Sequence, residues 1–243
     1  MAGIAGIDSS DKQSEVAHLL QRLAHRGPDG SKILTQPAAT LGAVWPEAQV
    51  QPMTPALQES VVWDGSAPPA LEPQALSDTR TPFAVAAATP QGVLLARDPL
   101  GVCPLYYGRM QDGTLCFASE VKAVLAVTAE VHEFPPGAWY ESGKGVRFFA
   151  QVSPRAVLPS PEVESIASAL RARLETAVQR RIDSPIMGCW LSGGLDSSAI
   201  AALARPHVRE LHTFAAGVKG APDLQHARRA AAHFKTHHHE VIV

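Results

Sequence analysis

The segment "CWLSGGLDSSAIAALA", residues 189–204, carries the strongest fold signal in the chain. It begins with an apolar run typical of a buried strand, passes through a loop of small residues, and ends in an alanine-rich run that favours a helix. Two adjacent glycines, Gly193 and Gly194, let the backbone turn tightly and expose its N–H groups. The helix that follows adds the positive end of its dipole. The segment therefore predicts an anion cradle suited to phosphate.

Polar side chains in the same loop add to this cradle. Ser192, Ser197 and Ser198 provide hydroxyl donors, and Asp196 provides the oxygen ligand that Mg²⁺ prefers beside phosphates. The pattern is not a Walker A motif, because GxxxxGK[ST] is absent from the chain. A structural alternative stays open, in which the segment is a glycine-rich turn between strand and helix with N-capping serines.

Residues 161–243 alternate between helix and strand patterns. A helix is predicted over 161–182, where the apolar residues Ile166, Leu170, Leu174 and Val178 recur at helical spacing. The later elements follow in the order strand, helix, strand, helix, strand, at 186–191, 197–205, 211–218, 223–234 and 239–243. Strands separated by helices pair in parallel through crossover connections, so this part predicts a parallel sheet.

The first 150 residues predict β-rich layers with one or two helices. Apolar or alternating runs predict strands at 2–7, 83–88, 92–98, 104–109 and 115–120. An amphipathic helix is predicted over 14–25, with Ser14 as its N-cap. The proline-rich stretches 65–82 and 153–160 are predicted to be a loop and an interdomain linker, respectively.

Composition excludes several classes of protein. The 243 residues carry a formal net charge of −2, which gives no global basic field for nucleic acid. The chain has no apolar run long enough to span a membrane, and its N-terminus lacks the pattern of a signal peptide. Its three cysteines show no CxxC spacing, and their odd number fits a reducing compartment better than a disulfide framework. We therefore expect a cytoplasmic protein without nucleic-acid or membrane partners.

The loop sequence resembles a known nucleotide-binding motif. Ser-Gly-Gly-Leu-Asp-Ser-Ser, residues 192–198, is similar to the PP-loop of N-type ATP pyrophosphatases, which grip the pyrophosphate end of ATP. Further blocks narrow the resemblance to the asparagine synthetase family, and they occur in the family's order. These blocks are "HRGPDG" (25–30), "ARDPLGVCPLYYG" (96–108), "FASEVKAVL" (117–125), "EFPPGAWY" (133–140) and the stretch 211–241.

The resemblance implies two domains of mixed α+β and α/β class. Residues 1–152 would form a glutaminase-like αββα sandwich of the N-terminal-nucleophile (Ntn) type, and 161–243 the first half of a parallel-sheet PP-loop domain that binds ATP and Mg²⁺. The residues that match the pyrophosphate site are Ser192, Gly193, Gly194, Asp196, Ser197 and Ser198, with Asp196 as the Mg²⁺ ligand. Leu191 and Ala216 match positions that contact adenosine.

Several departures from the family pattern predict that glutaminase activity is absent. The family's nucleophile is an N-terminal cysteine exposed after methionine removal, and Ala2 stands in its place. The family also stabilises the oxyanion with an asparagine, but this chain contains no asparagine, and "VVWDGS" (61–66) lies at roughly that position. Ser77-Asp78-Thr79 resembles a relic of the segment that holds the glutamine amine, and Cys103 is expected to serve packing.

A glutaminase-like domain without its nucleophile beside an intact PP-loop resembles β-lactam synthetases and lasso-peptide cyclases. The family's second acidic loop and catalytic lysine are absent from the sequence. Three explanations stay open: a partner chain supplies them, the chain is truncated, or the protein is a non-catalytic scaffold. We expect an ATP-dependent, AMP-forming amide ligase component with a carboxylate substrate and a protein partner or homo-oligomer; ammonia-dependent asparagine synthesis is a further alternative.

Three other features have a structural and a functional interpretation. The histidines in "THHHE" (236–240) alternate faces if the segment is a strand, so a structural role is favoured over a metal site. The pair Arg97-Asp98 is interpreted as structural. Arg26 either lines the former glutamine pocket or fixes the turn that follows it.

Overall fold

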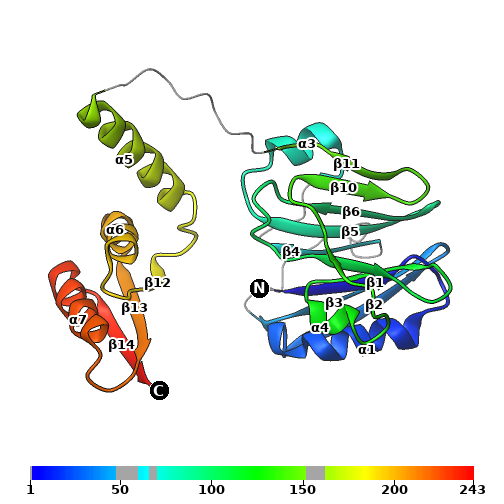
Figure 1. Ribbon diagram of the computed structural model, residues 1–243, viewed down its shortest axis with the longest axis horizontal. Coiled ribbons are helices and arrows are strands. Elements are labelled where there is room, and N and C mark those ends of the chain that lie inside the picture. Colours follow the sequence, from blue (N-terminus) through cyan, green and yellow to red (C-terminus); the bar gives the residue numbers. More distant parts are fainter. Residues whose placement is uncertain (1, 48–59, 66–69, 152–161) are drawn as a thin grey trace. The chain divides into compact units, whose positions relative to one another are not determined.

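The structure is a computed structural model that describes residues 2–47, 60–65, 70–151 and 162–243. The chain divides into two compact units, Met1–Pro154 and Arg155–Val243 (Figure 1). The predicted linker at 153–160 lies outside the described residues. Among the described residues, no helix is both long and apolar enough to cross a membrane.

Two antiparallel sheets form the first unit. The six-stranded sheet has the order β2 (Gly30–Gln36), β3 (Ala39–Trp45), β1 (Gly3–Ile7), β8 (Leu115–Ala118), β7 (Tyr106–Arg109) and β9 (His132–Glu133). The five-stranded sheet has the order β11 (Gly145–Phe148), β10 (Ala138–Glu141), β6 (Gly92–Arg97), β5 (Phe83–Thr89) and β4 (Val61–Gly65). The predicted strands in this unit are therefore confirmed.

Three apolar layers hold the first unit together. Between the two sheets, residues such as Ile4 and Phe117 from one sheet pack against Leu95 from the other. Helices α1 (Gln13–Leu23) and α4 (Val121–Val124) cover the outer face of the six-stranded sheet (Figure 1). The short helix α3 (Pro73–Asp78) packs on the outer face of the five-stranded sheet. The order helix, sheet, sheet, helix is the predicted αββα sandwich.

Helix α1 shows how the sequence pattern becomes packing. Its four buried residues, Val16, Leu19, Leu20 and Leu23, follow the i, i+3, i+4, i+7 spacing of one helical face. The N-cap is Lys12, which makes no side-chain capping bond, so the expectation of a Ser14 cap was wrong. The helix was predicted to run to residue 25, but Ala24–Arg26 is a 3₁₀ turn that carries the chain towards β2.

The prediction of a loop over 65–82 was wrong in part, because Pro73–Asp78 is helical. Pro73 stands at the start of the helix, where its missing N–H group costs no hydrogen bond. Leu76 is fully buried against the five-stranded sheet, so docking of one leucine stabilises a helix that local propensity did not reveal. The predicted relic Ser77-Asp78-Thr79 forms the end of this helix, and Asp78 accepts a bond from Gln74 Nε2 at 3.2 Å.

The second unit is the predicted parallel sheet with crossover helices. Its elements are α5 (Val163–Gln179), β12 (Ile186–Trp190), α6 (Leu195–Ala204), β13 (Glu210–Gly217), α7 (Pro222–Phe234) and β14 (His237–Ile242). The strands pair in parallel in the order β12, β13, β14. Helix α6 and strand β14 each begin two residues earlier than predicted, so Asp196 and Ser197 lie in the first helical turn.

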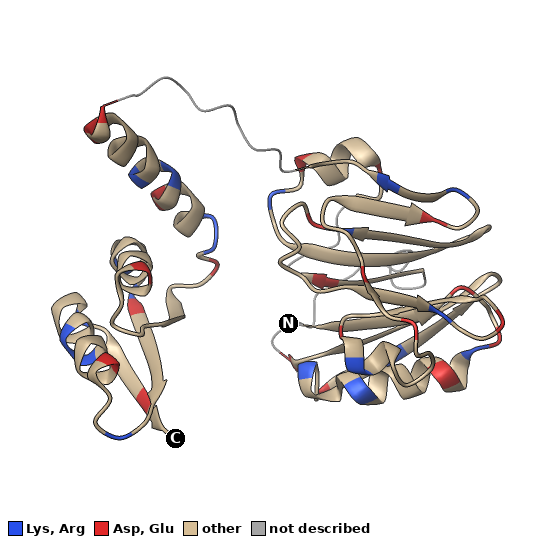
Figure 2. Cartoon of the chain, viewed as in Figure 1, with Lys and Arg blue, Asp and Glu red and all other residues tan. Residues whose placement is uncertain are grey.

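The core of the second unit is small. Leu191, Leu211 and Leu224 pack with small residues of α6 and α7 on one face of the sheet. Of the apolar stripe predicted for α5, Val178 is buried, whereas Ile166 and Leu170 are 50% and 55% exposed. Basic and acidic residues are interspersed along α5 and α7 (Figure 2), in keeping with the small net charge.

Candidate functional site

The predicted PP-loop joins β12 to α6. Leu191 follows the strand, and its N–H group donates to Phe214 O of β13 at 2.8 Å, which fixes the loop to the sheet. Since β12 and β13 run in parallel, the loop and the end of β13 lie at the same, carboxyl edge of the sheet. Ligands of open α/β sheets bind at this edge.

Gly193 determines the shape of the loop. Its φ angle is +81°, in the left-handed region that favours glycine. A Cβ atom on this residue would lie 2.5 Å from Ala227 N and 2.6 Å from His226 Cβ. The backbone therefore passes directly against helix α7, and no side chain fits there. Gly194, by contrast, has an ordinary φ of −74° and is the N-cap of α6.

Two serines connect the ends of the loop. The hydroxyl oxygens of Ser192 and Ser197 lie 3.0 Å apart, and the N–H group of Ser192 donates to Ser197 Oγ at 3.2 Å. The hydroxyl of Ser197 also lies 3.3 Å from the carbonyl oxygen of Gly194, to which it can donate. These bonds hold the first turn of α6 over the loop, so hydroxyls and helix N-terminus face the same region.

The remaining predicted residues divide between the surface and the core. Asp196 lies exposed in the first turn of α6, and Ser198 is half-buried in the same turn. The side chain of Leu191 is fully buried, so only its backbone is available to a ligand. Ala216 is exposed near the end of β13. The structure thus brings 191–198 together in one loop and places Ala216 at the same edge.

The predicted position of the family's glutaminase site lies in the first unit, where Ala2 precedes β1 and Asp64 lies near the end of β4. Ala2 is buried, with 8% exposure, and its carbonyl oxygen accepts from Arg26 Nε at 2.9 Å. The Arg26 guanidinium also donates to Asp64 Oδ2 at 2.6 Å and to Glu120 Oε1 at 3.3 Å. Arg26 therefore links three segments and has a wider role than fixing its own turn.

The Asp64 carboxylate is a buried hydrogen-bond acceptor. Its side chain has no exposure, and burial raises its pKa, while the Arg26 guanidinium and the charge at the N-terminus oppose this rise. Its Oδ1 atom has no hydrogen-bond partner within the described residues. The sequence prediction missed this pairing. The available signal was the Asp-Gly pair in "VVWDGS", which lies at roughly the place of the family's asparagine segment.

Cys103 packs in the core, as expected. It is buried between the two sheets, and burial together with the negative charges of Asp64 and Asp98 raises its pKa to about 12. The thiol is therefore protonated at neutral pH and is a poor nucleophile. Cys116 is also buried, and its pKa is raised to about 11.

The pair Arg97-Asp98 has the structural role that was predicted. The Asp98 carboxylate accepts from the backbone N–H groups of Leu100, Val102 and Cys103 at 3.0–3.1 Å. The Arg97 guanidinium donates to carbonyl oxygens of the same loop and to Phe134 O at 2.7 Å. Both residues are buried, so they fix the loop between β6 and β7.

The histidine segment forms part of β14, and its side chains alternate faces, as expected for a strand. His238 points to the covered face and contacts Thr213 Oγ1 at 2.9 Å. His237 and His239 lie on the opposite face, where both stack with His212 of β13. No group of three or more His, Cys, Asp or Glu side chains is arranged to hold a metal ion in the part of the chain that the structure describes.

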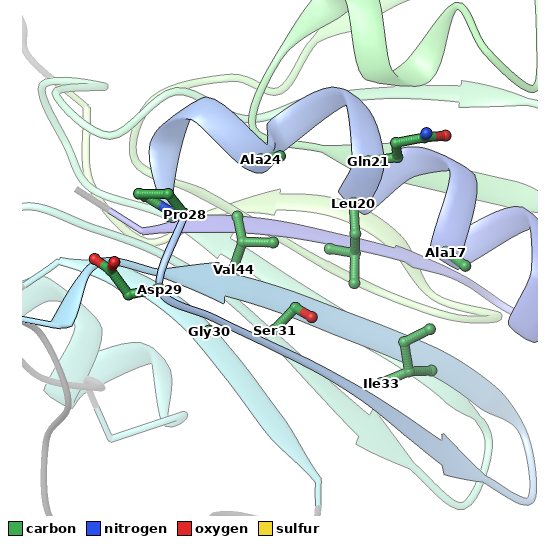
Figure 3. Close-up of a pocket in the computed structure, with 11 residues that line it drawn as sticks. Ala17, Leu20, Gln21, Ala24, Pro28, Asp29, Gly30, Ser31, Ile33 and Val44 are labelled. Carbon is green, nitrogen blue, oxygen red and sulfur yellow. The ribbon is translucent and has the colours of Figure 1, made fainter.

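A groove of about 570 Å³ lies beside helix α1 (Figure 3). Leu20 and Val44 form its floor, while Asp29 and Ser31 stand at the β2 side. Asp29 is already used as an acceptor for the N–H group of Glu47 at 2.8 Å. None of the predicted site residues lines this groove, and we assign it no role in the chemistry.

Comparison with solved structures defines the class of fold. A structure described as the allosteric regulatory enzyme of purine biosynthesis matches 99% of this chain and 80% of its own length, with a TM-score of 0.51 and 16% identity. Glutamine phosphoribosylpyrophosphate amidotransferase from B. subtilis matches 87% of this chain, with a TM-score of 0.50 and 16% identity. The chain has an Ntn amidotransferase-like fold, followed by a short parallel sheet.

Sequence comparison gives the family. The glutamine amidotransferase domain profile matches residues 74–144, and the asparagine synthase profile matches 169–243. Asparagine synthetase [glutamine-hydrolyzing] of Zea mays is 39% identical over 160 residues, which is 60% of this chain. Asparagine synthetase B [glutamine-hydrolyzing] of Escherichia coli is 34% identical over 188 residues, or 70% of this chain. The chain belongs to the asparagine synthetase family, and it covers 27% and 34% of these two relatives.

Proposed function

We propose that this chain is the ATP-binding component of an AMP-forming amide ligase and that it lacks glutaminase activity. The observation that supports this most is the 191–198 loop, which has a left-handed Gly193 and lies at the carboxyl edge of a parallel sheet. Its residues would hold the pyrophosphate group of ATP. Bound ATP would supply the activation of a carboxylate by adenylation with release of pyrophosphate, and an amine would then displace AMP.

The residues of the loop fit a nucleotide phosphate. The first N–H groups of α6 have no partners within the helix and are available to an anion. Asp196 is exposed beside them, and Mg²⁺ is commonly held by one or two carboxylates plus the phosphates themselves. A single carboxylate in this loop is therefore sufficient for the protein's share of the first Mg²⁺ contacts. Ala216 is exposed at the same edge, where the adenosine would lie.

Three observations support the absence of glutaminase activity. The methyl group of Ala2 cannot attack an amide, and Cys103 keeps its proton at neutral pH. Asp64 stands at roughly the place of the family's oxyanion-stabilising asparagine, where an ionised carboxylate would repel the developing negative charge. Incubation with glutamine should therefore release no glutamate, and Ala2→Cys alone should not restore the release.

We also propose that further polypeptide completes the synthetase site. The family's second acidic loop and lysine are missing from this sequence. In the second unit, Trp190 is 75% exposed, and the apolar residues Ile166, Leu170 and Val241 are also exposed. Apolar surface of this kind is typical of an interface. A partner chain, another copy or a longer form of the same protein would cover it, with the carboxylate and amine substrates held near the added residues.

Calorimetric titration of the full chain with Mg·ATP tests the proposal. We expect binding that Asp196→Ala weakens at least about tenfold, because a charged contact of about 1.4 kcal/mol or more is lost. Asp223→Ala is the matched control, since Asp223 is an exposed aspartate in the first turn of α7. It should leave ATP binding unchanged.

The same titration, together with an assay of AMP formation, separates the ligase proposal from the scaffold and asparagine-synthesis alternatives. If neither the wild-type chain nor the chain with its candidate partners binds ATP, the ligase proposal fails and a non-catalytic scaffold is favoured. If ATP binds and AMP forms only with aspartate and ammonium present, ammonia-dependent asparagine synthesis is favoured instead. Equal binding by the wild type and Asp196→Ala would contradict the assigned Mg²⁺ ligand.

A further inference from the structure

A second cavity, of about 270 Å³, opens between the two sheets of the first unit. Its floor consists of the buried residues Leu95, Leu115 and Phe134. Ile7, the last residue of β1, pairs with Cys116 next to Leu115, whereas Ala2 precedes the first residue of the same strand. The cavity is therefore at the opposite end of β1 from the predicted position of the family's glutaminase site and is independent of it.

Two half-buried tyrosines form the walls of this cavity. Tyr107 reaches it from β7 of the six-stranded sheet, and Tyr140 from β10 of the five-stranded sheet. The Tyr107 ring meets the edge of Phe134 at a centroid distance of 6.0 Å. Neither phenol hydroxyl has a hydrogen-bond partner within the described ranges of the chain. The walls thus offer aromatic surface together with two uncommitted hydroxyl groups.

Charges of both signs stand at the rim. Arg109 donates through Nη1 to Gly113 O at 2.8 Å, which leaves Nε and Nη2 without partners among the described residues. The positive charge of Arg109 acts to lower the pKa of Asp8. The Asp8 carboxylate already accepts a hydrogen bond from the Ser142 hydroxyl. Glu130 contacts His132 Nε2 through Oε1 at 3.0 Å, and its second oxygen remains available.

We propose that this cavity binds a free α-amino acid with an aromatic side chain. Arg109 would donate hydrogen bonds from Nε and Nη2 to the carboxylate of the ligand, in the forked geometry that guanidinium groups favour. The second oxygen of Glu130 would receive the ammonium group. The ring would lie between Tyr107 and Tyr140, where aromatic pairs are favourable. The cavity volume of about 270 Å³ is slightly below the range of pockets for drug-sized ligands. This size suits a single amino acid.

Thermal-shift and calorimetric titrations of the full chain test this proposal. The probes are L-phenylalanine, L-tyrosine, 3-phenylpropionate, which lacks the ammonium group, and phenethylamine, which lacks the carboxylate. We expect both amino acids to bind with a Kd below about 1 mM. Arg109→Gln and Glu130→Gln should each weaken binding about tenfold or more. Arg147→Gln is the matched control, because Arg147 is an exposed arginine on β11 that does not line the cavity.

Val146→Trp provides a second, steric variant. Val146 is 42% exposed at the rim, so a larger side chain can be placed there without disturbing the core and should block entry. The proposal is overturned if neither amino acid binds at about 10 mM, or if binding survives Val146→Trp. It is also overturned if 3-phenylpropionate binds as tightly as phenylalanine, because Glu130 would then contribute nothing.

Discussion

Replacement of Gly193 by alanine tests how closely the predicted PP-loop packs against α7. At φ +81° an L-residue costs about 1–2 kcal/mol more than glycine. The new Cβ would lie 2.5 Å from Ala227 N, about 1 Å inside normal contact, and forced overpacking costs about 1–3 kcal/mol. Alanine regains about 0.4–1 kcal/mol by restricting the unfolded chain. The second unit should therefore lose about 1–5 kcal/mol of stability.

Hydrogen exchange measured by mass spectrometry can assign this loss to the second unit. Peptides from β12 and α7 should exchange faster in Gly193→Ala, while peptides from the first unit should not change. Gly194→Ala is the matched control: its φ of −74° suits any residue, and its nearest neighbour, Ser192 Oγ, would lie 3.4 Å from the new Cβ. Equal protection of the two variants would refute the loop geometry and its contact with α7.

Two further predictions concern the first unit. Arg26→Met should destabilise it by about 3–5 kcal/mol, because Asp64 is left buried without its partner. Urea unfolding followed by tryptophan fluorescence measures this loss. The double variant Arg26→Met with Asp64→Asn should recover most of it. A loss below about 1 kcal/mol would contradict the buried pair. Burial raises the pKa of Asp8 above its ordinary 3.8, so its stabilising contribution is present below that pH and lost as pH rises through the folded-state pKa. Asp8→Asn should therefore gain stability relative to the wild type from pH 3 to 7 in urea midpoints; parallel profiles would contradict this.

Local patterns predicted much of the fold. The helical spacing of the apolar residues correctly predicted which face of α1 is buried, because an amphipathic helix packs its apolar face against the core. These residues are Val16, Leu19, Leu20 and Leu23. The alternation of strand and helix after residue 185 predicted the parallel sheet, since crossover connections allow few other arrangements. Helix ends were less certain. Ser14 was expected to be the N-cap of α1, but its hydroxyl bonds to Glu15 instead.

Long-range contacts could not be predicted in this way. Helix α3 depends on one buried leucine and a sheet that is formed by other segments, so its own sequence of prolines and polar residues indicated a loop. The ion pair between Arg26 and Asp64 joins residues 38 positions apart. The order of the strands decides which acidic residue pairs with which arginine. The motifs "HRGPDG" and "VVWDGS" do not contain that information.

Arg26 holds the start of β1 through the backbone carbonyl of Ala2, so this contact does not depend on the side chain at position 2. One guanidinium joins Ala2 at the start of β1, Asp64 near the end of β4 and Glu120 beside α4. An asparagine at position 64 would offer a donor to a substrate, whereas a carboxylate only accepts and is bound by the protein itself. Asp64 therefore adds a structural contact, and under the proposed function it also stands in place of a catalytic group. The proposed loss of the glutaminase reaction thus need not weaken this fold, and Asp64→Asn alone should weaken the bond to Arg26 without giving glutaminase activity.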